Sequence, residues 1–452
     1  MALIAPFRGL RYDPELVKDL SLVMAPPYDV VSPEDQRAFH ARHDHNVIRL
    51  ILGEVLEGDD STRNRYSRAG EYFRQWQAER VFIRDRTPAV YLYQQTFRLP
   101  RTRELTRCGL IGLVRLEEFG GCTVYPHERT MAAAKEDRLR LMQACHANLS
   151  PVFGVYPNRS RDLDRLFSTA QSSEPSIDLR DWDGVRHRVW ICQDRAAIRA
   201  LQADFASTPI FIADGHHRYE TALAFRDLMR AKEQNDPARE RQRPYNYIMM
   251  TLISAEDPGL VILPIHRLLR QLPGGSVEAY LGDIGRQFTV ERLPVPRDPE
   301  AGAAALLDSL KQTDEGIHRF GLYAGGESGY LLTLADEKAL AAEVAEGKPA
   351  VYRQLDVTIL HALLIEGPLR REGLAAPPDD ALNYTHDAVE AIRLTREGGW
   401  GAALLLNPTK IAEVLAVAEA GLRMPPKSTF FYPKLLTGLV IQPINLDELV
   451  DV

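Results

Sequence analysis

Cysteine is scarce in this sequence, with four residues among 452, and no two of them form a C-x-x-C pair. Their wide and irregular spacing excludes both a disulfide framework and the ligand pattern of a structural zinc site. A chain of this kind fits a reducing compartment, so we expect a cytoplasmic protein. The four positions are Cys108, Cys122, Cys145 and Cys192.

A basic surplus and long apolar runs are also lacking. The formal net charge is −7 at pH 7, whereas nucleic-acid-binding proteins usually carry a basic surplus. No apolar run approaches the roughly 18 residues of a membrane span, and the first residues lack the pattern of a signal peptide. We therefore expect neither general nucleic-acid binding nor a membrane partner. With 45% hydrophobic and 26% charged residues, the chain is long enough for two or three globular domains.

A strand–turn–helix corner in the middle of the chain is the most informative feature. Residues 210–213 (Ile-Phe-Ile-Ala) are typical of a short buried strand, Asp214 and Gly215 of a tight turn, and a helix is predicted to start near His216. Free backbone N–H groups and the positive end of a helix dipole make such a corner a natural anion site. We expect its anion to be a phosphate. The apolar stripe of the helix is Ala222, Phe225, Leu228 and Met229.

A second cluster lies around Pro126-His127-Glu128, ahead of another predicted helix for which Thr130 is a plausible N-cap. Lys135 and Arg138 are three residues apart, so they share one helix face. This face could direct the positively charged side chains of Lys135 and Arg138 into a cleft, with His127 and Glu128 near the start of the helix. The alternative is an ordinary solvated charged face, and the sequence does not decide between the two.

Two stiff segments near the ends of the chain are candidate walls of a binding site. Near the N-terminus, two prolines hold Tyr28 and Asp29 in an extended stretch. This stretch is either a substrate contact or a structural corner. Near the C-terminus, polar groups between three aromatics suit a ligand pocket wall, although a strand that covers the core would have the same composition. The possible anion contacts there are Lys427, Ser428, Thr429 and Lys434.

Strands and helices alternate along most of the chain, which indicates an α/β fold, or an α+β fold with mixed sheets. We expect an N-terminal α/β region (1–160), a central region with the corner (161–340) and a C-terminal α/β region (341–452). Residues 157–184 have the composition of a polar linker or insertion, and we expect His187 at the surface. Predicted strands cover residues 46–50, 89–97, 108–116, 152–156, 185–191 and 246–254, and a long helix covers 61–80.

Six motifs are spread over the whole chain. They are Arg11-Tyr12-Asp13-Pro14, Ala25-Pro26-Pro27-Tyr28-Asp29-Val30, Pro126-His127-Glu128-x-Thr130, Ile212-Ala213-Asp214-Gly215-His216-His217-Arg218-Tyr219, Asn407-Pro408-Thr409, and Met424-Pro425-Pro426-Lys427-Ser428-Thr429 with Phe431-Tyr432-Pro433-Lys434. Together they resemble an uncharacterised bacterial and archaeal family known as domain of unknown function 1015. That resemblance implies membership over the full length and brings little established chemistry.

The Asp-Gly-His-His-Arg segment also looks like the nucleotide-binding signature of the ParB/sulfiredoxin-like superfamily, in which a Gly-x-His-Arg-type turn at a helix start holds nucleotide phosphates. The superfamily includes CTP-binding partition proteins, sulfiredoxins and free-serine kinases. No cysteine occupies the turn, and the acidic chain shows no DNA-binding module, so the first two activities do not fit. The resemblance implies a ParB/sulfiredoxin-like core and a kinase that uses ATP or ADP with Mg²⁺ to phosphorylate a small hydroxyl compound such as free L-serine.

A kinase of this kind assigns roles to the corner. Arg218 would contact a phosphate with two N–H groups, and Asp214 would bind Mg²⁺ or orient the turn. Glu128 or Glu220 would be the base for the acceptor hydroxyl. Further phosphate donors would be Gly215, His216 and His217, with added positive charge from Lys135 and Arg138, and substrate contacts would come from His127, Thr130, Tyr28, Asp29, Lys427, Ser428 and Thr429.

Two other functions stay open. His216, His217 and Asp214, with His127 or His266, could ligate the metal of a phosphatase or another hydrolase. Adjacent helix residues diverge by about 100°, however, which suits one metal less than residues four apart. The second alternative is a nucleotide-sensing module without catalysis, similar to the CTP-binding partition proteins. A homodimer is a further possible partner arrangement.

Overall fold

The computed structural model describes residues 2–100, 102–232, 240–311, 316–335, 344, 347–374, 378 and 380–451. The chain forms two compact units: unit 1 comprises Met1–Val261 and Pro433–Val452, and unit 2 comprises Ile262–Tyr432. This division differs from the three consecutive regions 1–160, 161–340 and 341–452. The reason is that strands on both sides of residue 160 hydrogen-bond within one sheet, and the end of the chain returns to unit 1.

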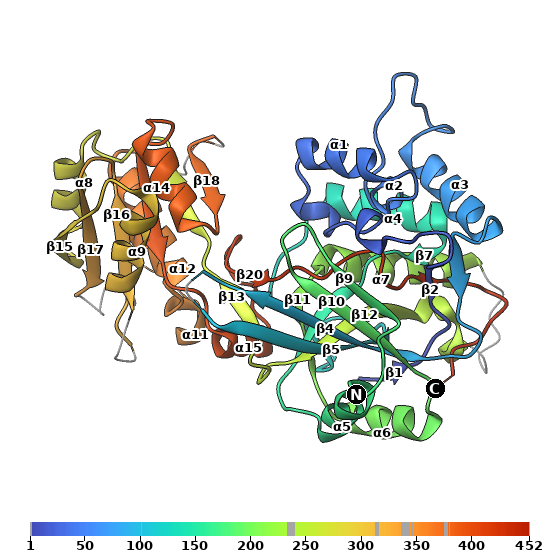
Figure 1. The fold of residues 1–452 in the computed structure, drawn as a ribbon. Helices are drawn as coiled ribbons and strands as arrows, with labels where there is room; N and C mark the ends of the chain where they lie inside the picture. The colour runs from blue at the N-terminus through green and yellow to red at the C-terminus, as the bar shows by residue number, and fades with distance from the viewer. Residues whose placement is uncertain are drawn as a thin grey trace. The chain divides into compact units, whose positions relative to one another are not determined.

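Unit 1 is built on a nine-stranded sheet (Figure 1). Its strands are β1 (Ile4–Ala5), β4 (Val90–Arg98), β5 (Glu104–Arg115), β6 (Val124–Pro126), β8 (Val152–Tyr156), β9 (Ile177–Arg180), β10 (Arg186–Cys192), β11 (Ile210–Asp214) and β12 (Tyr247–Ser254). Their order is β6-β11-β8-β12-β5-β4-β10-β9, and β1 pairs with β5. The pairs β6–β11 and β8–β12 are parallel, whereas the other pairs are antiparallel. The predicted mixed α/β fold is therefore confirmed.

Helices share one apolar core with this sheet. α5 (Arg161–Ala170) packs on α6 (Arg195–Phe205), and the two lie side by side in Figure 1. α3 (Arg65–Ala78) packs on α4 (Ala132–Cys145), which packs on α7 (His216–Lys232). In the predicted stripe of α7, Ala222, Phe225 and Met229 are buried, whereas Leu228 is exposed. The remaining elements of unit 1 are β2 (Leu10–Tyr12), α1 (Pro33–Arg42), α2 (Ile48–Ile51), β3 (Phe82–Arg84), β7 (Ala147–Asn148), β21 (Gln442–Pro443) and short turns of 3₁₀ helix.

Two segments have a structure other than the predicted one. Residues 46–50 contain the start of α2 rather than a strand, because Asn46 turns the chain: its Oδ1 accepts the N–H of Ile48, and its amide donates to the carbonyl of Met24. Residues 157–184 are not a linker, since they contain α5 and β9. Their polar composition reflects one-sided burial, and β9 alternates buried and exposed residues.

The prediction that His187 lies at the surface is wrong, because its side chain is fully buried. Its Nδ1 lies 2.6 Å from the Tyr93 hydroxyl, and its Nε2 lies 2.9 Å from Asp181 Oδ2. The N–H of Leu436 donates to the same Tyr93 oxygen at 3.5 Å. The hydroxyl proton is therefore directed to His187 Nδ1, and Nε2–H donates to Asp181. This chain of polar groups joins β4 and β10 to the C-terminal segment.

Unit 2 contains a six-stranded antiparallel sheet in the order β15-β17-β16-β19-β14-β18. In β19, Leu404 and Leu405 point to two different apolar cores, so both faces of the sheet are covered. The strands are β14 (His266–Leu269), β15 (Phe288–Pro294), β16 (Arg319–Tyr323), β17 (Ser328–Leu334), β18 (Leu382–Thr385) and β19 (Ala402–Leu406), with β13 (Val261–Leu263) and β20 (Phe430–Tyr432) as a separate pair. The helices include α8 (Val277–Ile284), α9 (Pro299–Leu310), α11 (Ala350–Arg353), α12 (Asp356–Ile359) continued by a π-helical turn (Leu360–Glu366), α13 (Gly367–Arg371), α14 (Ala388–Arg396) and α15 (Ile411–Glu419).

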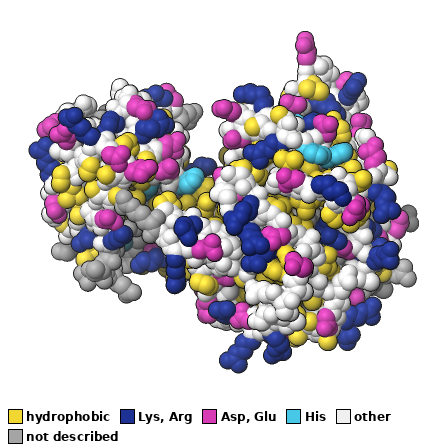
Figure 2. Space-filling view, in the orientation of Figure 1, with side chains coloured by type: hydrophobic (Ala, Val, Ile, Leu, Met, Phe, Trp, Pro, Cys, Tyr) yellow, Lys and Arg dark blue, Asp and Glu magenta, His cyan; other side chains and the backbone are white. Residues whose placement is uncertain are grey.

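Charged side chains of both signs are interspersed over the face of unit 1 that Figure 2 shows. None of the described helices has the length and apolar character needed to span a bilayer.

The buried Tyr93–His187–Asp181 chain predicts the first measurable effect. Replacing His187 by Leu leaves a buried carboxylate and a buried hydroxyl without their shared partner, which we expect to lower the free energy of unfolding by about 3 kcal/mol. Urea denaturation measures this loss. The control is His43→Leu, at a half-exposed histidine outside the sheet, where a change below about 1 kcal/mol is expected. Equal losses in both variants would contradict a structural role for this chain of groups.

Candidate functional site

The predicted corner is formed in unit 1 by β11 and α7. β11 ends at Asp214, Gly215 follows with a φ of +92°, and α7 starts at His216. A Cβ atom on Gly215 would lie 2.9 Å from the guanidinium of Arg218. Glycine is therefore needed at this position for two reasons. It adopts the left-handed backbone without strain, and its lack of a Cβ atom leaves room for the Arg218 side chain to fold back over the turn.

The first N–H groups of α7 are open in the sense that they have no acceptor among the described residues, although Gly215, His216 and Arg218 are themselves buried. The main-chain N–H groups of residues 215–218 donate no hydrogen bond to another described residue, and the helical pattern begins with the Tyr219 N–H, which donates to the Gly215 carbonyl at 3.0 Å. α7 is 17 residues long, so the positive end of its dipole adds to these donors. Together they make the corner attractive to an anion.

Strand β6 brings His127 and Glu128 to the same place. It runs parallel to β11, with Pro126 opposite Ile212. Because parallel neighbours end at the same edge of a sheet, the residues that follow β6 lie beside those that follow β11, from Asp214 onward. This pairing makes one site out of two motifs that are far apart in the sequence.

The side chain of His216 connects the two strand ends. The N–H of His127 donates to His216 Nε2 at 3.2 Å, so the proton of the ring is on Nδ1. Nδ1 lies 3.3 Å from Glu128 Oε2, although the two groups are not aligned for a hydrogen bond. The rings of His127 and His216 pack edge to face with centroids 4.6 Å apart. Burial, assisted by the neighbouring His216, lowers the pKa of His127 to about 3, so His127 is neutral at physiological pH.

Glu128 is half-buried beside His216. Desolvation would raise the pKa of Glu128, but the His216 contact outweighs it and lowers the pKa below the ordinary value. Glu128 is therefore ionised over the physiological range.

Asp214 is held by two cations. Its Oδ2 accepts a hydrogen bond from Arg218 Nη2 at 2.9 Å, and its Oδ1 accepts one from Lys434 Nζ at 3.2 Å. Desolvation would raise the pKa of Asp214, but Lys434 and Arg218 outweigh it and hold the pKa at about 2. The contribution of this carboxylate to stability is thus present above its ordinary pKa of 3.8 and is lost as the pH falls through about 2. Arg218 also donates to the carbonyl of Pro151.

Asp29 faces the same cluster from a short 3₁₀ turn, Tyr28–Val30. The residue is exposed to solvent, yet surrounding protein desolvates its carboxyl in part. This desolvation and the nearby charge of Asp214 raise the pKa of Asp29, while Arg218 and Lys434 act in the opposite direction. The Asp29 side chain makes no hydrogen bond to another described residue. Its carboxylate accepts a hydrogen bond from its own backbone N–H, which leaves an oxygen open to a ligand.

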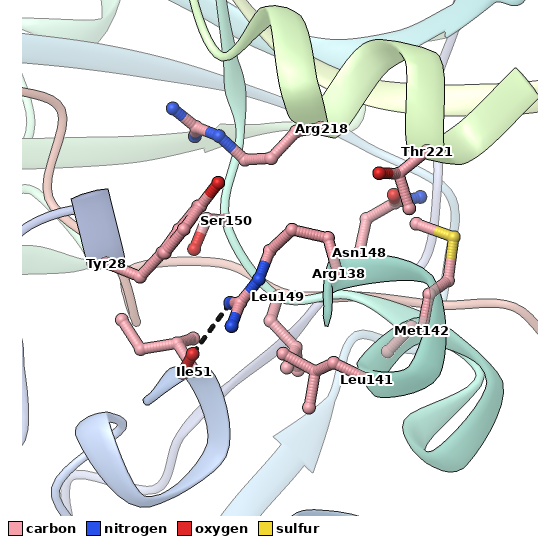
Figure 3. A pocket seen from close by; sticks show the side chains of 11 residues that line it. Tyr28, Ile51, Arg138, Leu141, Met142, Asn148, Leu149, Ser150, Arg218 and Thr221 are labelled. Carbon is pink, nitrogen blue, oxygen red and sulfur yellow. Dashed lines mark hydrogen bonds between the residues drawn. The ribbon is translucent and has the colours of Figure 1, made fainter. Parts of the chain in front are cut away.

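Arg138 supports the turn that carries Asp29. Its guanidinium carbon lies 3.9 Å from the centre of the Tyr28 ring. Its Nη1 donates to the carbonyl of Ile51 at 2.7 Å (Figure 3), and its Nε donates to Asp137 Oδ2 at 2.6 Å. Burial, with a smaller effect of Asp29, raises the pKa of Tyr28 to about 12. Arg138 thus has three protein partners, so its guanidinium is engaged by the protein even where it faces a cavity.

Thr130, Lys135 and Glu220 form a cluster of their own. Thr130 Oγ1 and Lys135 Nζ each donate to Glu220 Oε2 at 2.8 Å. Thr130 is therefore not the N-cap of α4, whose N-cap position is Met131. The N–H of Met131 donates to His217 Nε2 at 3.0 Å. Desolvation would raise the pKa of Glu220, but the bonds from Lys135 and Thr130 lower it.

A small cavity of about 40 Å³ lies beside Arg218, and Tyr28, Arg138 and Ser150 help to line it. In Figure 3 the hydroxyl end of Tyr28 is directed toward the Arg218 side chain. The volume suits one or two water molecules, whereas pockets for drug-sized ligands measure roughly 300–1,000 Å³. A nucleotide would have to bind on the open side of the corner.

Three predicted substrate contacts belong to unit 2. Lys427 is exposed, and its carbonyl accepts a hydrogen bond from Arg267 at 3.0 Å. Ser428 Oγ donates to the carbonyl of Pro425 at 2.5 Å, and Thr429 follows it. Lys434, from the same motif, belongs to unit 1 and reaches Asp214. The sequence analysis identifies Lys434 only as one of several possible anion contacts. No signal in the sequence distinguishes the role of Lys434 from that of Lys427.

A preformed metal centre is not a feature of the described part of the chain. Within it, no group of three or more His, Cys, Asp or Glu side chains could hold a metal ion. Both nitrogens of His216 face protein groups, and both oxygens of Asp214 are bonded to cations.

The chain belongs to the family described as Protein of unknown function (DUF1015), whose family model matches residues 4–358. The expected family membership is thus confirmed, and the last two of the six motifs, Asn407–Thr409 and Met424–Lys434, lie beyond the matched residues. No curated protein matches the sequence.

Several solved structures are similar to this chain at low identity. A free serine kinase in complex with AMP is 12% identical with a TM-score of 0.29, over 68% of this chain and 83% of that chain. SbnI with a C-terminal truncation, from Staphylococcus aureus, is 10% identical with a TM-score of 0.34, over 74% and 87%. A conserved hypothetical protein from Pyrococcus furiosus is 12% identical with a TM-score of 0.30, over 72% and 94%. TM-scores of this size establish neither a shared fold nor a shared activity.

The contact between Gly215 and Arg218 leads to a prediction with a matched control. Gly215→Ala combines a left-handed backbone with a clash on the guanidinium, whereas Gly120→Ala, at a φ of +95°, meets no atom within 4 Å. The backbone cost of about 1–2 kcal/mol is common to both variants, and the clash adds about 1–3 kcal/mol for Gly215→Ala alone. Chemical denaturation measures both losses, and equal losses would show that Arg218 does not need this close approach.

Proposed function

We propose that the β11–α7 corner binds the phosphates of ATP or ADP, and that the protein transfers a phosphoryl group to the hydroxyl of a small molecule. The observation that carries the proposal is the set of open N–H groups of residues 215–218 at the start of α7. Next to them lie three carboxylates, Asp29, Glu128 and Asp214, and two cations, Arg218 and Lys434. The resemblance of Asp-Gly-His-His-Arg to the ParB/sulfiredoxin-like signature supports the same ligand and makes free L-serine the first acceptor to test.

The main-chain N–H groups are the direct phosphate donors in this proposal. Arg218 is buried and bonded to Asp214 and to the Pro151 carbonyl. These bonds use one N–H of Nη1 and one of Nη2, so the expected bidentate contact with a phosphate would use the remaining N–H groups, of which Nε–H is buried without an acceptor. In its observed position Arg218 adds positive charge at short range. His217, half-buried beside it, completes the donor set with its ring.

Among the carboxylates near the corner, Asp29 suits the role of general base best. A base works best when its pKa lies near the working pH. The pKa of Asp29 is raised and its carboxylate has an oxygen open to a ligand, whereas Glu128 has a lowered pKa and Glu220 is bonded to Thr130 and Lys135. In the reaction, the acceptor oxygen bonds to the terminal phosphorus, the bond from that phosphorus to the nucleotide oxygen breaks, and the hydroxyl proton moves to Asp29.

Magnesium usually binds through one or two carboxylates together with substrate phosphates. Glu128 fits this need, since it is ionised, half-exposed and next to the open N–H groups, whereas Asp214 has no free oxygen. The ion would neutralise phosphate charge that develops in the transition state. Glu128 is therefore the preferred carboxylate ligand in place of the expected Asp214.

The two alternatives have less support. A metal-dependent hydrolase would need the histidines as ligands, and both nitrogens of His216 and one nitrogen of His217 face protein groups. A nucleotide sensor would bind at the same corner without turnover, so the two experiments below separate it from a kinase.

The first experiment tests binding. ATP or ADP at about 100 times its Kd is expected to add roughly 2.7 kcal/mol to the stability of the protein, measured as a thermal shift. Inorganic phosphate and an uncharged nucleoside serve as comparisons for the contribution of the phosphate chain. If no nucleotide stabilises the protein, the kinase and the sensor are both excluded.

The second experiment tests the base. Asp29→Asn is expected to lower turnover by about 10²- to 10⁴-fold while the affinity for nucleotide stays nearly unchanged, because the N–H donors are intact. Glu34→Gln, at an exposed position in α1, is the control and should keep full activity. Phosphorylated product from serine and other small alcohols is detected by phosphorus NMR. Full turnover in Asp29→Asn would exclude Asp29 as the base.

A further inference from the structure

The segment that brings Lys434 to the corner enters unit 1 directly from unit 2. β20 ends at Tyr432, unit 1 resumes at Pro433, and Lys434 is the next residue. A lysine has a long flexible stem, so its position depends on how its backbone is held. The two carbonyls at this point, of Pro433 and Lys434, are both bound by buried side chains.

Gln95 and Arg107 bind these carbonyls. They lie opposite each other on β4 and β5 and are each 1% exposed. Arg107 Nη2 donates to the Pro433 carbonyl and to Gln95 Oε1, and its Nε donates to the same Oε1 at 3.1 Å. Gln95 Nε2 then donates to the Lys434 carbonyl at 3.0 Å. The side-chain amide of Gln95 thus accepts hydrogen bonds from the Arg107 guanidinium and donates one to the backbone carbonyl of Lys434.

This pair of side chains also lies close to the strands of the corner. The Arg107 guanidinium carbon is 5.0 Å from the centre of the Phe153 ring, and Phe153 is the register partner of Asp214 between β8 and β11. From the anchored backbone, the Lys434 side chain extends to Asp214 and is only 15% exposed. Both ends of Lys434 are therefore fixed by unit 1.

We propose that Gln95 and Arg107 are positioning residues that hold Lys434 against Asp214. Neither residue touches a ligand in this proposal, and both act through the lysine. The consequence for the proposed phosphoryl transfer is a charge balance: Arg218 and Lys434 supply +2, and Asp29, Glu128 and Asp214 supply −3, for a sum of −1. Without Lys434 in place the sum is −2, which opposes the approach of phosphate more strongly.

Gln95→Glu tests the positioning with almost no change in size. The glutamate keeps an oxygen for Arg107 but has no N–H for the Lys434 carbonyl. The readout is the pKa of Asp214 in ligand-free protein, measured by NMR of labelled aspartate and assigned with Asp214→Asn. The other titratable and charged groups that act on Asp214 stay unchanged; they are Arg218, His216, Asp29, Glu128 and His127.

The expected result is a graded rise of the Asp214 pKa from about 2. Lys434→Met should raise it by about 1–3 units, Gln95→Glu by part of that amount, and Lys434→Arg should keep most of the shift. Gln94→Glu, which adds the same charge one residue away, is the control: Gln94 accepts from Arg188 and has no bond to Lys434. In the Lys434→Met background, Gln95→Glu should have no further effect.

An unchanged Asp214 pKa in Gln95→Glu would overturn the proposal, as would a shift that persists in the Lys434→Met background. If Gln95→Glu does not fold, Arg107→Lys gives the same readout, because it keeps the charge and loses the double contact with Gln95 and Pro433. The titration contains no nucleotide. Its failure therefore leaves the proposed kinase untouched, and a protein without nucleotide binding could still show the predicted shift.

Discussion

Parallel pairing of β6 with β11 is the constraint on which the candidate site depends. It places Pro126 opposite Ile212, so that Glu128 and the open N–H groups at the start of α7 share one edge of the sheet. His216 holds the two strand ends together through the backbone of His127 and the carboxylate of Glu128. Without this pairing, the N–H donors of α7 would be those of an ordinary solvated helix start. Many proteins have such donors, and they do not by themselves specify a ligand.

Two carboxylates at the corner differ because their surroundings differ. Asp214 is bonded to Arg218 and Lys434, which hold its pKa at about 2, whereas Asp29 is partly desolvated beside that negative charge and its pKa is raised. Groups whose environments separate their pKa values in this way can take different roles in a reaction. Asp214 is suited to fix cations in place, and Asp29 is suited to exchange a proton.

The sequence predicts local structure at this site well, because apolar periodicity and turn residues are local signals. Strand 152–156 has the predicted bounds, and the turn at Gly215 leads into α7 as expected. The predictions from the sequence fail where contacts between residues far apart in the chain determine the structure. Asn46 starts a helix through side-chain bonds that include the distant Met24 carbonyl, and His187 is buried because its ring lies between Tyr93 and Asp181. The role of Lys434 follows from the return of the chain to unit 1, which no local pattern encodes.

Amide NMR of protein labelled at glycine, histidine and arginine, titrated with ADP, tests most directly whether the N–H groups of residues 215–218 hold nucleotide phosphates. If they do, the amide resonances of Gly215, His216, His217 and Arg218 shift in saturable fashion, while that of Gly120, a turn glycine with open space around it, does not. Saturable ADP binding that leaves these four resonances unmoved would contradict a phosphate site at the start of α7.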